Sequence, residues 1–344
     1  MTVGFIIVCL LFTILFLSAV RKAAGKTELF PLVILLVLTA VSGLRYDVGV
    51  DYPVYREVYD SPSDIRALAF EPFWIFFSEW LRDMGFASRM WFILTSAAIN
   101  LLMYYGIKRM SVNPYLSLLL YVVMSFGYVE TFNMVRQYVA IGILFATFHY
   151  VTENKVWKYL LFIVLAACFH LSALLMLPFL LLMRIRYPIW LLWIVFCTLF
   201  FFGRQLLTVF LNYVIPFIPT YGFYADRIIL EDYSGFLKLF YFFVGCGILA
   251  VAPYLTKRYA TGYLYINAVL MALMWYFVFI DIQVFMRGMF YLVVFLFILI
   301  PMLTDVLAPR TRMLLTPLIV LLFLTVTLKM HWSVPYNFDF QLFY

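Results

Sequence analysis

Long uncharged apolar runs constrain this chain more than any other feature. Residues 3–20, 29–44 and 159–183 contain no Asp, Glu, Lys or Arg. About 20 consecutive apolar residues in a helix are enough to cross the hydrocarbon core of a bilayer. Only 12% of all residues are charged, against about a quarter in soluble domains. A soluble fold cannot bury this much apolar surface, so the sequence predicts a polytopic protein of an inner (cytoplasmic) membrane.

The cysteines and the net charge exclude several classes of function. Cys9, Cys168, Cys197 and Cys246 stand singly inside apolar runs, which is typical of small hydrophobic residues rather than of a disulfide framework or a metal site. The net charge of +7 is spread along the chain one or two bases at a time. This spread fits membrane topology better than nucleic-acid binding. We therefore expect no nucleic-acid partner and no cofactor, and metal dependence stays open.

The apolar runs predict an all-α protein with about 10–12 transmembrane helices in a single domain, 1–344. Residues 70–86 are amphipathic and predict a helix that lies in the membrane interface. The run 159–183 is longer than one span needs, and it contains His170 and Pro178. We expect a re-entrant or broken helix near residue 170. The expected spans lie at about 3–20, 29–44, 90–107, 114–129, 134–151, 188–203, 236–255, 261–280, 284–303 and 313–329.

Basic residues fix the expected orientation. Short basic loops are retained in the cytoplasm, and here they fall at Arg21 to Lys26, Lys108/Arg109, Lys155/Lys158, Arg184/Arg186, Lys257/Arg258 and Arg310/Arg312. This assignment requires both ends of 159–183 to lie on the cytoplasmic side of the membrane, which favours the re-entrant form. Two full crossings by this segment would also leave both ends on that side. The outer face then carries two long connections, 45–88 with the amphipathic helix and 204–235.

Arginines dominate the bases of the predicted outer face. Arginine stays charged in apolar surroundings, and its planar fork suits a bidentate grip on phosphate or carboxylate. An arginine cluster at the membrane boundary predicts an anionic, lipid-linked ligand such as a polyprenyl diphosphate. The aromatic residues of 204–235 suit stacking on sugar rings, or they form an ordinary interfacial belt. The outer residues of interest are Arg45, Asp47, Asp51, Arg136, Arg204, Arg227, Asp281 and Arg287, with His170 pointing toward them.

Four segments in order resemble the EpsG-like family of Wzy-type polysaccharide polymerases. Residues 45–55 resemble its R-x-x-x-G-x-D-Y-x-x-Y opening, and Asn133-Met-Val-Arg136-Gln137 resembles its Asn-x-x-Arg-Gln signature. Phe169-His170-Leu-Ser172 with Pro178 is similar to its F-H-x-S element. Arg287-Gly-Met-Phe-Tyr291 is similar to its late Arg-x-x-x-Tyr element. Each match is short, but together they cover most of the chain between residues 45 and 291.

The resemblance implies a GT-C-type glycosyltransferase of the bacterial inner membrane. Such enzymes join oligosaccharide repeat units carried on undecaprenyl diphosphate at the periplasmic or outer face. A chain-length regulator and a flippase of the same pathway are the further partners that it implies. Sugar specificity does not carry over, because the sequence between the motifs diverges within such families.

Glycosyl transfer from a diphosphate requires a stabilised leaving group and a base for the acceptor hydroxyl. We assign Arg136 and Arg287, with Arg45 as a third, to the diphosphate; the alternative is that they pair with Asp47, Asp51, Glu130 or Asp281. His170 is the candidate base because imidazole changes charge near neutral pH, or it is a buried structural histidine. Asp51 is the rival base, or it orients His170 or pairs with an arginine. Gly49 is expected to allow a turn that returns Asp51 to the membrane.

Further residues are predicted to bind substrate or diphosphate: Arg45, Asp47, Tyr52, Asn133, Gln137, Tyr291, Arg204 and Arg227. Two other functions remain open at this point. An O-antigen-ligase-type enzyme would use the same donor but transfer the glycan to a lipid A core. A lipid-linked oligosaccharide flippase would show internal repeats and charges at mid-membrane, neither of which the sequence displays. A metal-dependent GT-C enzyme would use an acidic pair, for which Asp47 and Asp51 are candidates.

Overall fold

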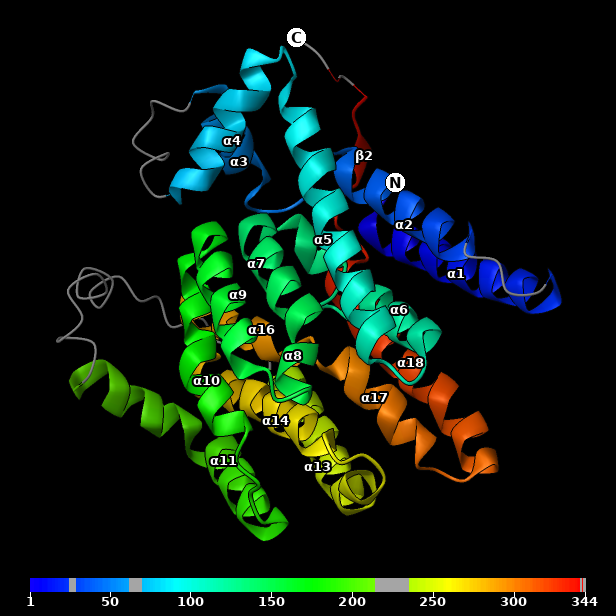
Figure 1. Cartoon of the computed structure of the whole chain (residues 1–344), viewed down its shortest axis with the longest axis vertical. Helices are drawn as coiled ribbons and strands as arrows, with labels where there is room; N and C mark the ends of the chain where they lie inside the picture. The colour runs from blue at the N-terminus through cyan, green and yellow to red at the C-terminus, as the bar shows by residue number, and fades with distance from the viewer. Residues whose placement is uncertain (25–28, 62–69, 214–234, 341, 343–344) are drawn as a thin grey trace. The chain divides into compact units, whose positions relative to one another are not determined.

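The computed structural model describes residues 1–24, 29–61, 70–213, 235–340 and 342, and most of these residues are helical (Figure 1). The helices form two compact units. The first comprises Met1–Leu174 and Leu307–Tyr344, and the second comprises Leu175–Val306. The prediction of an all-α polytopic fold is confirmed.

The first unit contains the predicted loop at Arg45 and the segments 133–137 and 169–172. Its core is built around α5 and α7, which pack against each other; α2 packs on α5, and α9 packs on α7. Its helical segments are α1 (Val3–Ala24), α2 (Leu29–Gly43), α3 (Tyr52–Asp60), α4 (Pro72–Asp83), α5 (Ser88–Met110), α6 (Pro114–Val123), η2 (Val129–Phe132), α7 (Val135–Thr147), α8 (His149–Thr152), α9 (Val156–Phe169), η3 (Leu171–Leu175) and α18 (Pro309–His331).

The second unit is organised around α14. This helix is buried along nearly its whole length, and α10, α11, α13, α16 and α17 pack on it. Asn267 of α14 donates hydrogen bonds to the carbonyls of Met183 (2.9 Å) and Ile185 (2.8 Å), which satisfies the end of α10. The elements are α10 (Met176–Met183), α11 (Ile189–Tyr213), α13 (Gly235–Arg258), α14 (Gly262–Phe279), α15 (Gln283–Met286), η5 (Arg287–Met289), α16 (Phe290–Val293) and α17 (Leu296–Asp305).

Five helices in the described ranges are long and apolar enough to cross a membrane, namely α5, α11, α13, α14 and α18. A sixth span results if Gln283–Val293 and Leu296–Asp305, which meet at a bend of 44°, cross as one. Two of the expected spans are shorter as helices than predicted. The span at 134–151 forms α7, which ends at Thr147. The span at 114–129 ends as a helix at Val123, because the chain turns tightly at Gly127, where a Cβ would lie 2.0 Å from the carbonyl oxygen of Tyr121.

The helix break predicted near residue 170 is present. Helix α9 ends at Phe169, His170 is extended (φ −159°, ψ 114°), and a 3₁₀ turn begins at Leu171. The indole of Trp74 donates a 2.7 Å hydrogen bond to the carbonyl of Phe169. A carbonyl at the end of α9 therefore finds its partner on α4, which fixes the position of the break.

The amphipathic segment predicted at 70–86 forms α4. Its twelve residues extend about 18 Å, well short of the ~30 Å hydrocarbon core. Trp74, Ser78 and Leu81 are buried, whereas Phe76 and Trp80 are exposed. This one-sided burial agrees with a helix that lies along a surface rather than crossing the membrane.

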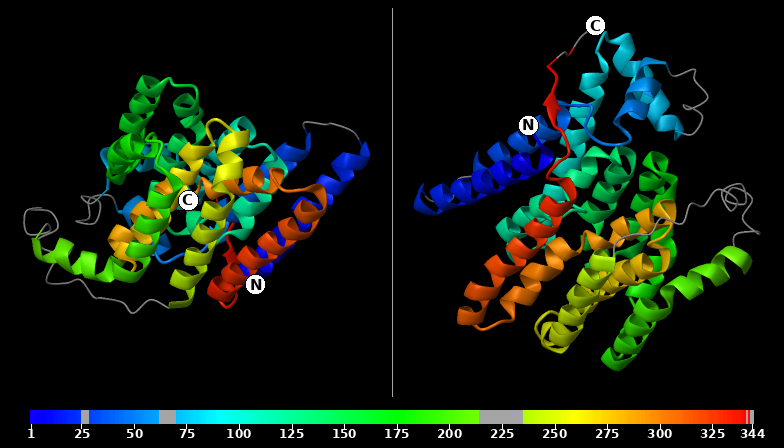
Figure 2. Two further views of the ribbon diagram at one scale, coloured as in Figure 1. Left: turned by 90° about the horizontal axis from the view of Figure 1, so that it is seen from below. Right: turned by 180° about the vertical axis from the view of Figure 1, so that it is seen from behind.

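A short β-ladder joins the Arg45 loop to residues 337–338, and the sequence did not predict it. Strand β1 (Arg45–Tyr46) pairs antiparallel with β2 (Asn337–Phe338). The C-terminal segment then runs beside the beginning of the chain (Figure 2), where Val3 N–H donates to the Val334 carbonyl at 2.9 Å. Strands of two residues leave no alternating pattern in the sequence.

The predicted outer connection 204–235 overlaps an element of the second unit. Helix α11 continues to Tyr213, ten residues into that connection, and residues 214–234 lie outside the described ranges. The organisation as one domain over 1–344, with outer connections at 45–88 and 204–235, stays a prediction.

Gly49 makes the turn expected of it. Its φ of +105° is a conformation that residues with a Cβ rarely adopt, and a Cβ there would lie 2.7 Å from the carbonyl oxygen of Phe132. Asp47 also has a positive φ, +53°. The turn therefore presses the Arg45 loop against the end of η2.

We expect Gly49→Ala to lower the free energy of unfolding by roughly 1–3 kcal/mol, because it combines backbone strain with a close contact. The measurement is the midpoint of thermal unfolding in detergent. Gly85→Ala is the matched control, since Gly85 has a φ of +80° but nothing within 4 Å of its Cβ position. Equal losses in both variants would show that the contact with Phe132 contributes nothing.

Candidate functional site

A single carboxylate joins two of the predicted site residues in the first unit. Glu71 Oε2 forms an ion pair with Arg136 Nη1. Glu71 Oε1 lies 2.9 Å from His170 Nδ1 and also accepts a hydrogen bond from the Leu171 N–H at 3.2 Å. Three segments that are distant in the sequence thus meet at Glu71.

The ends of helices place these three side chains. Glu71 immediately precedes α4, whose first residue is Pro72. Arg136 is the second residue of α7, just after the 3₁₀ turn η2. His170 is the extended residue that terminates α9. Polar side chains gather here because the helix ends offer irregular backbone and unpaired N–H groups, which an apolar helix interior does not.

The surroundings of Arg136 are aromatic. Its guanidinium carbon lies 3.8 Å from the ring centroid of Phe70, and its charge opposes the rise that burial causes in the pKa of the Tyr55 hydroxyl. The side chains of Arg136 and Glu71 are 17% and 15% exposed, and that of His170 is 26% exposed. The centre is therefore largely withdrawn from solvent, and its histidine is the most accessible member.

The electrostatics favour a charged Glu71. Burial opposes ionisation, but the hydrogen bond from His170 and the positive charge of Arg136 outweigh it, and the pKa of Glu71 falls to about 2. An ionised carboxylate accepts hydrogen bonds only, so we assign the proton of a neutral His170 to Nδ1. Nε2 is then the nitrogen that carries the lone pair.

One N–H donor of the Arg136 guanidinium is available to a ligand. Its Nε is buried and has no hydrogen-bond partner among the described residues. An unsatisfied buried N–H is costly, and a ligand oxygen placed there would satisfy it. The arrangement can therefore receive an anion beside a histidine whose second nitrogen accepts a proton.

Arg45 lies in the interior of the first unit. Its side chain is fully buried and donates to the carbonyls of Ser42 and Phe132, the latter at 3.2 Å. Its guanidinium carbon is 4.9 Å from the ring centroid of Phe92. Burial lowers the pKa of Arg45 to about 10, so it remains charged at neutral pH. In this position it links the C-terminal end of α2 to η2; its role as a third diphosphate ligand stays a prediction.

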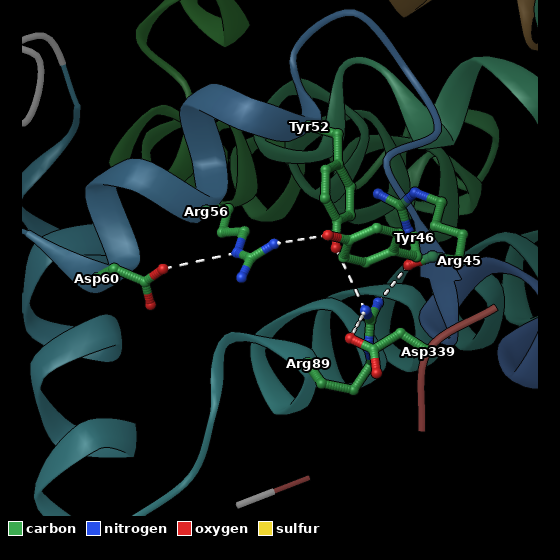
Figure 3. Close-up of polar contacts among 7 residues, drawn as sticks. All are labelled: Arg45, Tyr46, Tyr52, Arg56, Asp60, Arg89 and Asp339. Carbon is green, nitrogen blue, oxygen red and sulfur yellow. Dashed lines mark hydrogen bonds and ion pairs between the residues drawn. The ribbon is translucent and has the colours of Figure 1, made fainter. Parts of the chain in front are cut away.

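Arg89 is a second buried arginine beside Arg45. It donates to the carbonyl of Arg45 and to the hydroxyl of Tyr52 (3.3 Å), and it forms an ion pair with Asp339 (Figure 3). Tyr52 stacks on Phe92 with ring centroids 4.5 Å apart. The structure therefore places Tyr52 inside this network, where burial raises the pKa of its hydroxyl.

The first two sequence motifs contact each other directly. Asn133 Oδ1 accepts a 2.6 Å hydrogen bond from the Val50 N–H. Asp51 is half-buried and precedes α3, and Asp47 is exposed. Gln137 is buried within α7. The side chain of Asn133 thus positions the Arg45 loop. The segment that contains Asn133 then leads into α7 and Arg136.

The other predicted residues belong to the second unit. Arg204 Nε pairs with Asp281 Oδ2 at 3.1 Å, and its side chain is 62% exposed. Arg287 begins η5 and is half-buried, whereas Tyr291 is buried in α16. Arg227 lies outside the described residues. Asp281, considered from the sequence as a partner of Arg136 or Arg287, is paired with Arg204.

Sequence reasoning missed Glu71, Arg89 and Asp339. The sequence suggests Asp47, Asp51, Glu130 or Asp281 as the partner of Arg136, whereas Glu71 lies in the amphipathic segment that predicts an interfacial helix. One signal was present: a glutamate directly before a proline, at the start of an aromatic helix, is placed at a helix end rather than on its solvated face. Arg89 and Asp339 are 250 residues apart and gave no signal.

Comparison with known proteins identifies a family. The model of the EpsG family matches residues 28–342. No curated protein and no solved structure matches the chain.

The depressed pKa of Glu71 predicts an acid-sensitive stabilisation. The folded value of about 2 lies below the ~4.3 of an unfolded glutamate, so the stabilisation is complete above about pH 4.5 and is lost as the pH falls toward 2. We expect the free energy of unfolding of wild type to exceed that of Glu71→Gln by on the order of 3 kcal/mol at pH 7. This difference should become smaller as the pH is lowered. Thermal unfolding midpoints between pH 7 and pH 3 measure this.

The matched control is Glu79→Gln, which alters an exposed carboxylate on the same helix. Its thermal unfolding midpoint should equal that of wild type at every pH. A Glu71→Gln deficit that stays constant down to pH 3 would contradict the assignment of an ionised Glu71 paired with Arg136.

Proposed function

Because the chain belongs to the EpsG family, we propose that it is a membrane glycosyltransferase that polymerises a polysaccharide from lipid-linked repeat units. The observation that carries the proposal is the Glu71 carboxylate, which holds Arg136 and His170 together. A cation for a leaving anion and a base for an attacking hydroxyl are the two groups that glycosyl transfer from a diphosphate needs.

The proposed donor is a growing glycan on undecaprenyl diphosphate, and the acceptor is the terminal sugar of a new lipid-linked unit. The reaction takes place at the periplasmic or outer face of the inner membrane. The apolar spanning helices support the membrane location, and the arginines support an anionic carrier. A chain-length regulator and a flippase are the proposed partners in the same pathway.

The acceptor hydroxyl oxygen forms a bond to the anomeric carbon of the donor while the bond from that carbon to the diphosphate oxygen breaks. The hydroxyl proton passes to His170 Nε2, and the diphosphate leaves with the bonding pair. Arg136 donates to the departing anion through Nε. The assignment of Arg287 to the diphosphate stays a prediction from the sequence.

Glu71 has a positioning role in this scheme. Its bond to Nδ1 fixes the tautomer and the ring orientation of His170, and it stabilises the imidazolium that forms on proton transfer. Its bond to Arg136 holds one face of the guanidinium while Nε remains for the ligand. Asp51 stays the rival base, and it is half-buried at the start of α3.

Purified protein with undecaprenyl-diphosphate-linked repeat units from the native pathway tests the proposal. We expect a ladder of lengthening lipid-linked glycan from wild type. Arg136→Ala, Arg287→Ala and His170→Ala should each slow its formation by about 10²-fold or more. Retained activity in His170→Ala would move the base to Asp51 or to the substrate.

Arg109→Ala is the matched arginine control, since Arg109 pairs with Glu153 in a loop predicted to be cytoplasmic. It should leave the ladder unchanged. A parallel reaction with EDTA tests metal dependence. Transfer to added lipid A core without a ladder would make the protein a ligase, and movement of intact units across liposomes without bond formation would make it a flippase.

A further inference from the structure

A polar pocket of about 310 Å³ lies beside the Arg45 loop, apart from the Glu71 centre. Its wall is formed by β1 and one side of α3, and it includes Tyr46, Asp47, Tyr52, Arg56, Glu57 and Asp60. This volume is near the lower end of the ~300–1,000 Å³ range of small-molecule sites and admits about one or two sugar rings. We call it the α3 pocket.

The charges of the α3 pocket exclude a diphosphate. Asp47, Glu57 and Asp60 contribute three carboxylates, against the single guanidinium of Arg56. An anion would meet net repulsion there, whereas the Arg136 centre has a buried donor to offer. The two places are therefore suited to different parts of one substrate.

The polar groups of the α3 pocket suit a hydroxyl-rich ligand. Arg56 Nη1 donates a 3.2 Å hydrogen bond to the Tyr46 hydroxyl, and Arg56 Nε lies 3.6 Å from Asp60 Oδ2 (Figure 3). Both side chains of the Arg56–Asp60 pair are more than 40% exposed, so this pair is weak and opens at little cost. Sugar hydroxyls donate to carboxylates and accept from a guanidinium, so they can replace these contacts.

The Tyr46 ring supplies an apolar wall. It is 38% exposed and is held edge-on to Tyr52, with centroids 6.1 Å apart. The negative face of an aromatic ring attracts the polarised C–H groups of a pyranose. An exposed aromatic ring beside carboxylates and one arginine is the combination that packs on one face of a sugar and binds its edge.

Helix α3 separates the pocket from the Glu71 centre. Tyr55 is buried and its hydroxyl is close enough to Arg136 to be affected by its charge, whereas the next residue, Arg56, faces the pocket. A helix with its side chains is about 10 Å thick, so a sugar in the α3 pocket lies on the order of 10 Å from the diphosphate centre. That distance is greater than one pyranose ring. The pocket would therefore contact a sugar beyond the one whose anomeric carbon reacts.

From these observations we infer that the α3 pocket is a glycan subsite, which binds an uncharged or amine-bearing sugar of the repeat unit remote from the bond that forms. This inference rests on the proposed function and deepens it. The subsite would select repeat units by their sugars, and the Arg136 centre would bind the carrier diphosphate. Selection of one repeat unit over another would then depend on β1 and α3.

The test uses full-length protein in nanodiscs and the repeat-unit oligosaccharide released by mild acid from the lipid-linked precursor of the source strain. Binding is followed by saturation-transfer NMR and calorimetry. We expect Tyr46→Ala and the near-isosteric Asp60→Asn each to weaken oligosaccharide binding by about tenfold. Arg136→Ala should leave it unchanged, and inorganic pyrophosphate should not displace the sugar.

Tyr105→Ala is the matched control, because Tyr105 is an exposed tyrosine of the same unit on α5. Wild-type affinity in both pocket variants, or displacement by pyrophosphate, would overturn the inference. The ladder assay separates this outcome from a failure of the proposed function. If wild type forms a ladder but the pocket variants bind the oligosaccharide normally, only the subsite inference is wrong. If the pocket variants bind it more weakly but wild type forms neither a ladder nor a ligase product, only the polymerase proposal is wrong.

Discussion

The buried guanidinium of Arg45 is the interaction on which the first unit depends. A cation inside an apolar fold must be fully hydrogen-bonded or the fold loses several kcal/mol. Arg45 meets this requirement in part: its two Nη groups bind carbonyls at the ends of α2 and η2, its buried Nε has no partner among the described residues, and its own carbonyl accepts from Arg89. The charge thus specifies how three irregular segments meet. Because η2 leads directly into α7, the same requirement sets the position of Arg136.

In the Glu71 centre, the arginine is stabilised by a carboxylate rather than by backbone carbonyls. Arg136 and His170 are partly accessible, and a single carboxylate serves both. In the proposed function, the ion pair with Glu71 means that Arg136 is not an unpaired buried cation before the diphosphate arrives. The lower exposure of Glu71 than of His170 keeps this balance in place while the histidine meets solvent or substrate.

The sequence was sufficient for the fold class and for part of the site. Apolar runs predicted the helices, His170 predicted the break after α9, and Gly49 predicted the turn, because each depends on local chemistry. The partners of the buried charges were not predictable in the same way. Glu71, Arg89 and Asp339 act through contacts across 65 to 250 residues, and no local pattern reports which acid meets which base. The boundaries of short spans also escaped prediction, since the tight turn at Gly127 depends on a contact with Tyr121.

The pairing of β1 with β2 has a consequence for the order of events during synthesis. Arg45 and Phe338 lie opposite each other in the ladder, so the segment that carries Arg45 leaves the ribosome long before its strand partner exists. At translation rates of about 5–20 residues per second, the interval is tens of seconds. Throughout that time the nascent chain inserts its helices while β1 has no strand partner. The loop is therefore complete only after Asn337 and Phe338 have been made, so a chain that stops before them cannot form it.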